Sequence, residues 1–270
     1  MADSREVLTR PAEGPDVVLR YDHHDDALID VFLPAGLGHP ATPRPLVVLI
    51  HGGFWRQEWD RMPIRPLANA LRRRGLVVAV PEYRRTGGGG GWPQTGYDVE
   101  RALAVLPSAL DEVAPGRIEP QAACVLAGHS AGGHLALWAG LRAQPGRICS
   151  IVALAPVSDL RYAAEVGMGE GAVQALMGGE PHEQPENYAD ANVAPLLPGD
   201  IAVTVIQGTE DKQVTVEMNR RLAAAQSATP LRYIELEGVE HFALIDPLSA
   251  VFESTVLPAI TRAREKQRTG

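Results

Sequence analysis

The sequence predicts an α/β protein built on a mostly parallel β-sheet with helices on both faces. Wholly apolar runs, such as residues 46–50, alternate with helical segments along most of the 270 residues. A strand that is apolar at every position is typical of a sheet buried on both sides, and parallel strands are connected through helices. Hydrophobic residues make up 45% of the chain and charged residues 21%, which is typical of a globular protein with a substantial core.

The elements follow from this alternation in order along the chain. Residues 1–15 are polar and are interpreted as a loose lead-in. The predicted strands are 17–21, 27–33, 46–50, 76–80, 124–127, 148–154, 201–206 and 231–236. The predicted helices are 62–74, 97–113, the run after Ser130, 214–226 and 247–266. The His and Asp residues at 23–26 form a predicted solvated hairpin turn, because no further metal ligands follow at a suitable spacing.

Two irregular stretches interrupt the pattern. Residues 156–199 are rich in Gly and Pro and are too long for a simple crossover, so we expect a small cap insertion over the carboxyl ends of the strands. The run Gly87–Gly91 is a predicted flexible loop, and no P-loop lysine follows that would let it cradle phosphate. We expect the cap and the loop 82–97 to set specificity, within a single domain spanning residues 1–270.

The charge and composition exclude several classes of protein. The net charge of −8 argues against binding to nucleic acid or to an anionic membrane surface. No apolar run is long enough to span a bilayer, and residues 1–10 lack the apolar core of a secretion signal, so we expect a cytoplasmic protein. The two cysteines, Cys124 and Cys149, are predicted to be free thiols. We expect no metal and no cofactor; the oligomeric state is left open, a homodimer being one option.

A candidate nucleophile lies between an apolar strand and an Ala/Leu-rich helix. The stretch Gly128-His129-Ser130-Ala131-Gly132 fits G-x-S-x-G, the pattern of a sharp strand-to-helix turn that exposes a serine hydroxyl above the sheet. The pattern alone occurs by chance, but its placement after residues 124–127 makes it informative. Ser130 is therefore the predicted nucleophile.

A serine of this kind needs a base and an acid that orients the base. Asp211 follows the strand 201–206, and His241 follows the strand 231–236, so both are expected at the same sheet edge as Ser130. We interpret Asp211 as the acid and His241 as the base. Glu210 and Asp159 remain alternative acids, whereas His182 lies in the predicted cap and is expected to face solvent.

The developing oxyanion needs preorganised backbone donors. Ala131 supplies one N–H at the start of the helix, and Gly53 and Phe54 in the loop after residues 46–50 are the other candidates. His51 is interpreted as bracing this loop, and His134 as packing behind the strand-to-helix turn that carries Ser130. Trp55 and His129 are predicted to line the substrate pocket.

Together these features resemble those of the α/β-hydrolases, over about residues 17 to 262. The loop His51-Gly52-Gly53-Phe54-Trp55 resembles the H-G-G-x-W motif of the arylformamidase (kynurenine formamidase) branch and its esterase relatives, as do residues 208–211 and 240–247. Hormone-sensitive-lipase-like esterases have a third glycine where this chain has Phe54, so that group fits less well. The resemblance implies the α/β-hydrolase fold, a Ser130–Asp211–His241 triad and oxyanion donors at Gly53, Phe54 and Ala131.

The predicted function is that of a serine hydrolase acting on small carboxylic esters or amides through an acyl-enzyme. One alternative is an arylformamidase acting on formamides such as N-formylkynurenine, and an aminopeptidase-like activity fits less well. A non-catalytic binding module on a hydrolase fold is disfavoured because such modules usually lose a triad residue. An interfacial lipase is disfavoured by the polar, acidic composition.

Overall fold

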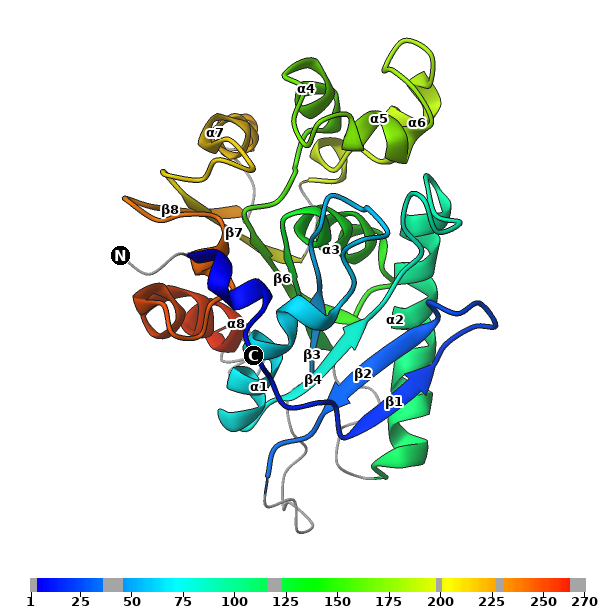
Figure 1. Ribbon diagram of the computed structural model, residues 1–270, viewed down its shortest axis with the longest axis vertical. Helices are drawn as coiled ribbons and strands as arrows, with labels where there is room; N and C mark the ends of the chain where they lie inside the picture. Colours follow the sequence, from blue (N-terminus) through cyan, green and yellow to red (C-terminus); the bar gives the residue numbers. More distant parts are fainter. Residues whose placement is uncertain (1–3, 36–45, 116–122, 198–200, 227–230, 263–270) are drawn as a thin grey trace.

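An eight-stranded sheet organises the part of the chain that the computed structural model describes, residues 4–35, 46–115, 123–197, 201–226 and 231–262 (Figure 1). The strand order is β1-β2-β4-β3-β5-β6-β7-β8. From β4 to β8 the neighbours pair in parallel, and β2 is antiparallel to both β1 and β4. The strands are β1 Val17–Arg20, β2 Leu28–Phe32, β3 Leu46–Ile50, β4 Val77–Pro81, β5 Cys124–His129, β6 Ile148–Leu154, β7 Ala202–Gly208 and β8 Leu231–Leu236.

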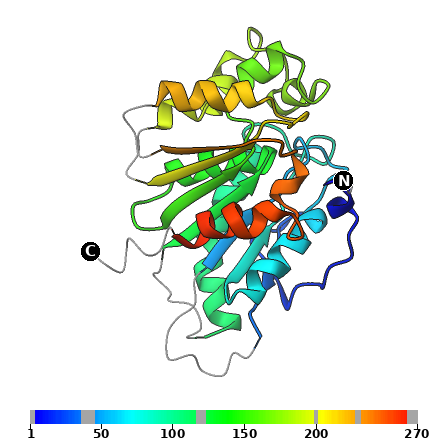
Figure 2. The same ribbon diagram turned by 90° about the vertical axis from the view of Figure 1, so that its left-hand side faces the viewer.

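Helices cover both faces of this sheet, as the sequence predicts (Figures 1 and 2). One face packs against α2 (Gln94–Val113), α3 (Ala131–Arg142) and α7 (Val216–Ala225), and the opposite face against α1 (Arg65–Arg73) and α8 (Leu257–Arg262). Each face has its own apolar core, and the wholly buried strands β3 and β4 contribute alternate side chains to the two cores. The predicted α/β-hydrolase fold is confirmed.

The described part of the predicted cap, residues 156–197, folds as three short α-helices beyond the carboxyl ends of the strands, α4 (Leu160–Glu165), α5 (Ala172–Met177) and α6 (Pro185–Asp190), followed by the 3₁₀ helix η3 (Ala194–Leu196) (Figure 1). Indole N–H groups join α6 to the body of the protein: Trp92 Nε1 donates to Asp190 Oδ2 over 2.9 Å, and Trp138 Nε1 donates to the Asp190 carbonyl over 2.8 Å. His134 Nε2 lies 2.9 Å from the carbonyl oxygen of Ala191. The cap is therefore anchored mainly to the α2 and α3 side.

The lead-in is more structured than its composition predicts. Ser4–Leu8 forms a 3₁₀ helix, η1, and Val7 is 1% exposed because it packs into the core formed with α1 and α8. The helix 62–74 begins as the 3₁₀ turn η2 (Met62–Ile64) before α1, and α2 begins three residues earlier than predicted. The last helical segment starts at Phe252, as a π-helical turn (Phe252–Val256) before α8, and the predicted residues 263–266 lie outside the described residues.

Candidate active site

Ser130 occupies a strained turn between β5 and α3. Its φ of 56° and ψ of −120° are an uncommon conformation for a residue with a side chain, and such strain persists only where the surrounding structure holds it. Ser130 N donates to Leu154 O over 2.8 Å, and Ser130 O accepts from His134 N over 3.1 Å. These bonds to β6 and α3 hold the turn.

Two glycines allow this turn because the neighbouring backbones pass too close for a side chain. A Cβ on Gly128 would lie 2.1 Å from the carbonyl oxygen of Gly132. A Cβ on Gly132 would lie 2.3 Å from the carbonyl oxygens of both Ile50 and His51. The G-x-S-x-G spacing thus follows from close contacts of the elbow with its own helix and with the end of β3.

The loop after β3 brings further backbone donors to the elbow. Gly53, Phe54 and Trp55 have φ values of 111°, 50° and 55°, so three consecutive residues adopt the left-handed region. Thr86 holds the loop from one side, since its N and Oγ1 both donate to Trp55 O over 2.8 Å. Within the described residues, the N–H groups of Gly53, Phe54 and Ala131 donate no hydrogen bond to the protein, so they are available to a ligand.

Arg56 holds the same loop from the cap. Its Nη2 donates to the carbonyl oxygens of Gly169 and Glu170 over 2.6 and 3.0 Å. The Phe54 ring packs so closely on Gly169 that a Cβ there would lie 2.6 Å from Phe54 Cδ1. The cap therefore contacts the strained loop directly.

Asp211 and His241 form a buried pair after β7 and β8. His241 Nδ1 lies 2.6 Å from Asp211 Oδ2, and Asp211 and His241 are 8% and 4% exposed. Asp211 also accepts hydrogen bonds from Gln207 Nε2 and from the N–H groups of Gln213 and Val214. Four donors thus hold the carboxylate in one orientation against the Nδ1 edge of the imidazole.

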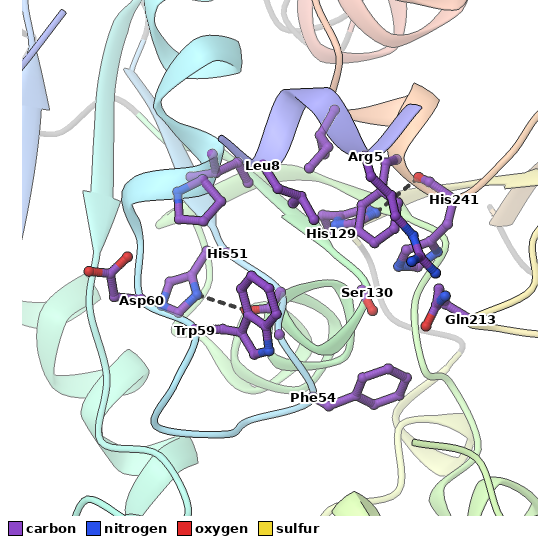
Figure 3. Close-up of a pocket in the computed structure, with 16 residues that line it drawn as sticks. Arg5, Leu8, His51, Phe54, Trp59, Asp60, His129, Ser130, Gln213 and His241 are labelled. Atoms are coloured by element: carbon purple, nitrogen blue, oxygen red, sulfur yellow. Dashed lines mark hydrogen bonds between the residues drawn. The ribbon is translucent and has the colours of Figure 1, made fainter. Parts of the chain in front are cut away.

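Ser130 and His241 open onto one cavity of about 300 Å³ (Figure 3). Gly52, Gly53 and Phe54 form one wall, and Phe54 and Trp59 lie across the cavity from His241. The other walls are mostly apolar, with Leu8, Pro63, Ile64, Phe242 and Ile245. The predicted nucleophile, base and oxyanion loop therefore meet at a largely apolar pocket.

His129 connects three parts of this site. Its ring centroid is 4.3 Å from that of His241, its Nε2 lies 3.2 Å from the His241 carbonyl oxygen, and its Nδ1 faces Gly52. Burial lowers the pKa of His129 well below its usual value, and the neighbouring His241 lowers it further. His129 lines the cavity, as the sequence predicts for this residue.

A second buried histidine–carboxylate pair stands behind the oxyanion loop. His51 Nε2 lies 2.8 Å from Glu82 Oε1, and its Nδ1 lies 2.8 Å from the carbonyl oxygen of Gly52. Arg85 is ion-paired with the same carboxylate, and Arg61 N donates to Glu82 Oε2 over 2.9 Å. Both nitrogens of His51 face oxygen acceptors, so the ring braces the loop, as the sequence predicts.

The alternative acids and base occupy other positions. Glu210 is exposed, and Asp159 caps α4 by accepting from Tyr162 N over 3.0 Å. His182 is exposed in the cap. Of the carboxylates considered, Asp211 is the one that contacts His241.

Trp55 corrects one prediction. It is 0% exposed and packs edge-on to His134, with ring centroids 5.5 Å apart, instead of lining the pocket. The left-handed conformation of Trp55 turns the indole into the core, and Trp59, four residues later, lines the cavity instead. A sequence pattern places a tryptophan in a loop but gives no sign of such a backbone turn.

The described residues of the cap and of the loop 82–97, which the sequence predicts to set specificity, lie outside the lining of this cavity. Among the described residues, neither contributes a lining side chain to the cavity, and the cap acts on it through Phe54. Cavity-lining residues that the sequence did not predict include Arg5 and Leu8 from η1, and Gln213, Phe242 and Ile245 from the loops after β7 and β8. Proximity to Asp211 and His241 could have indicated these last three, whereas nothing in the polar lead-in indicated the first two.

In the part of the chain that is described, no helix is long and apolar enough to cross a membrane. The described residues also contain no cluster of three or more His, Cys, Asp or Glu side chains arranged to hold a metal ion. His24, from the predicted hairpin turn, lies 3.5 Å from Asp98.

Comparison with known proteins gives a family and a fold. Residues 29–226 match the protein family described as BD-FAE. No curated protein is found to match the sequence. Several solved structures are similar to this chain over nearly its whole length, at identities low enough that the likeness speaks to the fold alone.

One is a truncated carbohydrate esterase from gut microbiota, with a TM-score of 0.78 and 17% identity over 96% of this chain and 100% of that chain. Another is esterase B from Lactobacillus rhamnosis, with a TM-score of 0.76 and 18% identity over 98% of this chain and 93% of that chain. A third is an esterase from Thermogutta terrifontis with propionate bound, with a TM-score of 0.71 and 21% identity over 93% of this chain and 94% of that chain.

Proposed function

The chain belongs to the BD-FAE family, and on this premise we propose that it is a serine hydrolase that cleaves small carboxylic esters. The observation that carries the proposal is the convergence, on one cavity, of the strained turn at Ser130 and the buried His241–Asp211 pair. A nucleophile, a base and an orienting acid are the groups that acyl transfer requires.

The proposed reaction begins when Ser130 Oγ attacks the ester carbonyl and His241 Nε2 takes its proton. Asp211 holds Nδ1 of His241, which keeps Nε2 turned to the cavity and stabilises the imidazolium that forms. The N–H groups of Gly53, Phe54 and Ala131 stabilise the oxyanion. His241 then protonates the leaving alcohol, and a water that gives a proton to His241 hydrolyses the acyl-enzyme and regenerates Ser130.

The size and lining of the cavity support a small acyl group. A cavity of about 300 Å³ with apolar walls excludes water from a short acyl chain or a single ring. The Thermogutta terrifontis neighbour, which has propionate bound, is an esterase that holds a short acid. The other two neighbours are also described as esterases.

Formamide hydrolysis is the alternative reaction, favoured by the H-G-G-F-W loop and by the aromatic side chains of Phe54, Trp59 and Phe242 around the cavity. We would compare kcat/KM for N-formylkynurenine with that for a short p-nitrophenyl ester. A preference of orders of magnitude for the formamide would assign the arylformamidase reaction, and turnover of the ester alone would assign the esterase.

The direct test of the proposed function is Ser130→Ala. We expect loss of turnover with little change in stability, together with loss of the fluorophosphonate adduct that the wild-type protein forms on Ser130. A clean preparation of Ser130→Ala with full activity would refute the proposal, and a wild-type protein without activity or adduct would favour a binding module.

A further inference from the structure

A second, smaller cavity adjoins the first on the side of the base. It has a volume of about 180 Å³ and shares Arg5, Gln213, His241 and Phe242 with the apolar pocket, but not Ser130 or the oxyanion loop. Its remaining walls are charged, from Glu210, Lys212 and Glu240. The two cavities therefore differ in polarity and meet at His241 and Gln213.

The chemistry of acyl transfer indicates which part of the ester each of the two cavities would bind. The carbonyl oxygen must point to the backbone donors at Gly53 and Phe54, which line the apolar pocket alone. The leaving oxygen must lie beside the imidazole that protonates it. The cavity that contains His241 but none of the proposed oxyanion donors is thus the side of the leaving alcohol.

Gln213 stands at the junction of the two cavities. Its N–H donates to Asp211 Oδ1 over 2.8 Å, which fixes its backbone in the loop after β7, and Gln213 lines the apolar pocket together with Ser130 (Figure 3). The side chain is half-buried, and no hydrogen bond joins its amide to any described residue. A half-buried amide without a partner gains most from a ligand that supplies one, because leaving it unpaired is unfavourable.

The charges around the smaller cavity restrict the class of alcohol that it can bind. Arg5 and Lys212 are balanced by Glu210 and Glu240, so the walls favour neither an anionic nor a cationic alcohol. A carboxamide both donates and accepts, and so does a hydroxyl group, whereas an alkyl group does neither. A neutral alcohol with a second hydroxyl near the ester oxygen matches this site.

We propose that Gln213 determines specificity for the leaving group, by hydrogen bonding to a hydroxyl of the departing alcohol. The inference rests on the proposed esterase function and adds the substrate class to it: esters of a small apolar acid with a hydroxylated alcohol. Gln213 contacts the substrate without taking part in proton transfer, so its role appears as a preference between leaving groups.

The test compares two esters of equal size, 2-hydroxyethyl propanoate and n-propyl propanoate, each corrected for its rate of alkaline hydrolysis. We expect wild-type kcat/KM to favour the hydroxyethyl ester about tenfold, the factor that corresponds to one net hydrogen bond. Gln213→Met keeps the length of the side chain and should reduce the ratio to about one. Gln144→Met is the matched control, because Gln144 is exposed in the turn before β6, outside both cavities, and should keep the wild-type ratio.

Each outcome decides the matter. A wild-type protein that hydrolyses both esters without preference overturns the inference while leaving the esterase function standing. A Gln213→Met protein that keeps the preference, or that loses activity equally on both esters, also overturns it. If the wild type hydrolyses neither ester and forms no fluorophosphonate adduct on Ser130, the proposed function itself fails.

Discussion

The two buried histidine–carboxylate pairs of this molecule have similar N···O distances, through Nδ1 in one pair and Nε2 in the other, and different surroundings. His241 lies 2.6 Å from Asp211, and His51 lies 2.8 Å from Glu82. Asp211 is held by an amide and two backbone N–H groups, and its histidine lines the cavity. Glu82 is ion-paired with Arg85 and Arg61, and both nitrogens of its histidine face acceptors.

The difference indicates why His241 suits the proposed role of a base, whereas His51 suits a structural role in holding the loop. A histidine can accept a proton from a substrate only if one nitrogen is left for the substrate, and a carboxylate supports the resulting imidazolium best when no other cation shares it. Only the pair after β7 and β8 meets both conditions. The pair after β3 and β4 instead fixes the strained loop that carries the proposed oxyanion donors.

The largest expected effect comes from breaking the pair assigned to catalysis. Asp211→Asn replaces the acceptor for His241 Nδ1 with a group that favours the wrong tautomer, and we expect kcat to fall by about 10⁴-fold. Steady-state kinetics with a p-nitrophenyl ester measures this fall. Thermal unfolding serves as the control for folding, and a kcat within tenfold of wild type would assign the role of acid elsewhere.

Disrupting the His51–Glu82 pair should mainly lower the stability of the fold. Glu82→Gln leaves the buried His51 without its anion and Arg85 with Asp26 alone, and removing one partner of a buried ion pair lowers the free energy of unfolding by about 3–5 kcal/mol. We expect kcat to fall about tenfold, far less than in Asp211→Asn. Urea unfolding measures the first quantity, and a variant as stable as wild type would show that the network adds nothing to the fold.

The His51–Glu82 pair also predicts a range of acidic pH over which the protein loses stability. Burial acts to raise the pKa of Glu82, but His51, Arg85 and hydrogen bonds outweigh burial and lower the pKa to about 2. A carboxylate with a lowered pKa contributes stability above its unfolded value of 4.5 and loses it as the pH falls toward 2. Unfolding curves between pH 5 and 2 should therefore be steeper in pH for wild type than for Glu82→Gln.

His134 sharpens the comparison because it is buried without a carboxylate. Burial lowers its pKa to about 4, outweighing the hydrogen bond at the Ala191 carbonyl. As the pH falls, His134 takes up a proton at a higher pH in the unfolded chain than in the folded protein. The free energy of unfolding therefore has its full value above pH 6.5 and falls by on the order of 3 kcal/mol as the pH drops to 4. His134→Gln, which can keep a donor toward Ala191, should flatten this part of the profile, and an unchanged slope would contradict the assignment.

The smallest expected effect tests the other support of the oxyanion loop. Arg56→Met removes the guanidinium that joins the loop to Gly169 and Glu170 in the cap, so we expect kcat to fall three- to tenfold with a smaller change in KM. Arg56→Lys should recover part of kcat because it still donates a hydrogen bond. The alternative result is that Arg56→Met and Arg56→Lys lose the same amount of activity and neither changes the ratio of kcat/KM between esters of small and large acids. That result would indicate a general loosening of the cap.

Local pattern predicted the centre of the sheet well because strands β3 and β4 are apolar at every position. Strand β3 spans the predicted residues 46–50, and the order of Ser130, Asp211 and His241 along the chain follows from the order of the strand ends. Asp211 and His241 meet because parallel strands bring their carboxyl ends to one edge.

The rest depends on contacts between distant segments, which a local pattern does not record. Trp55 points into the core because three left-handed residues turn the backbone. Leu8 reaches the cavity because Val7 beside it is buried against the α1 side of the sheet, a contact that a polar lead-in does not suggest. Gln213 becomes relevant only when the second cavity is seen.

The distribution of tryptophans has a spectroscopic consequence. Of the four tryptophans in the chain, Trp55, Trp92 and Trp138 are at most 6% exposed, whereas Trp59, which lines the apolar pocket, is 40% exposed. A water-soluble quencher such as iodide should therefore reach Trp59 selectively and extinguish the red edge of the emission spectrum. An occupant of the pocket would shield that indole, so the protein carries an intrinsic optical reporter of ligand binding that needs neither a label nor turnover.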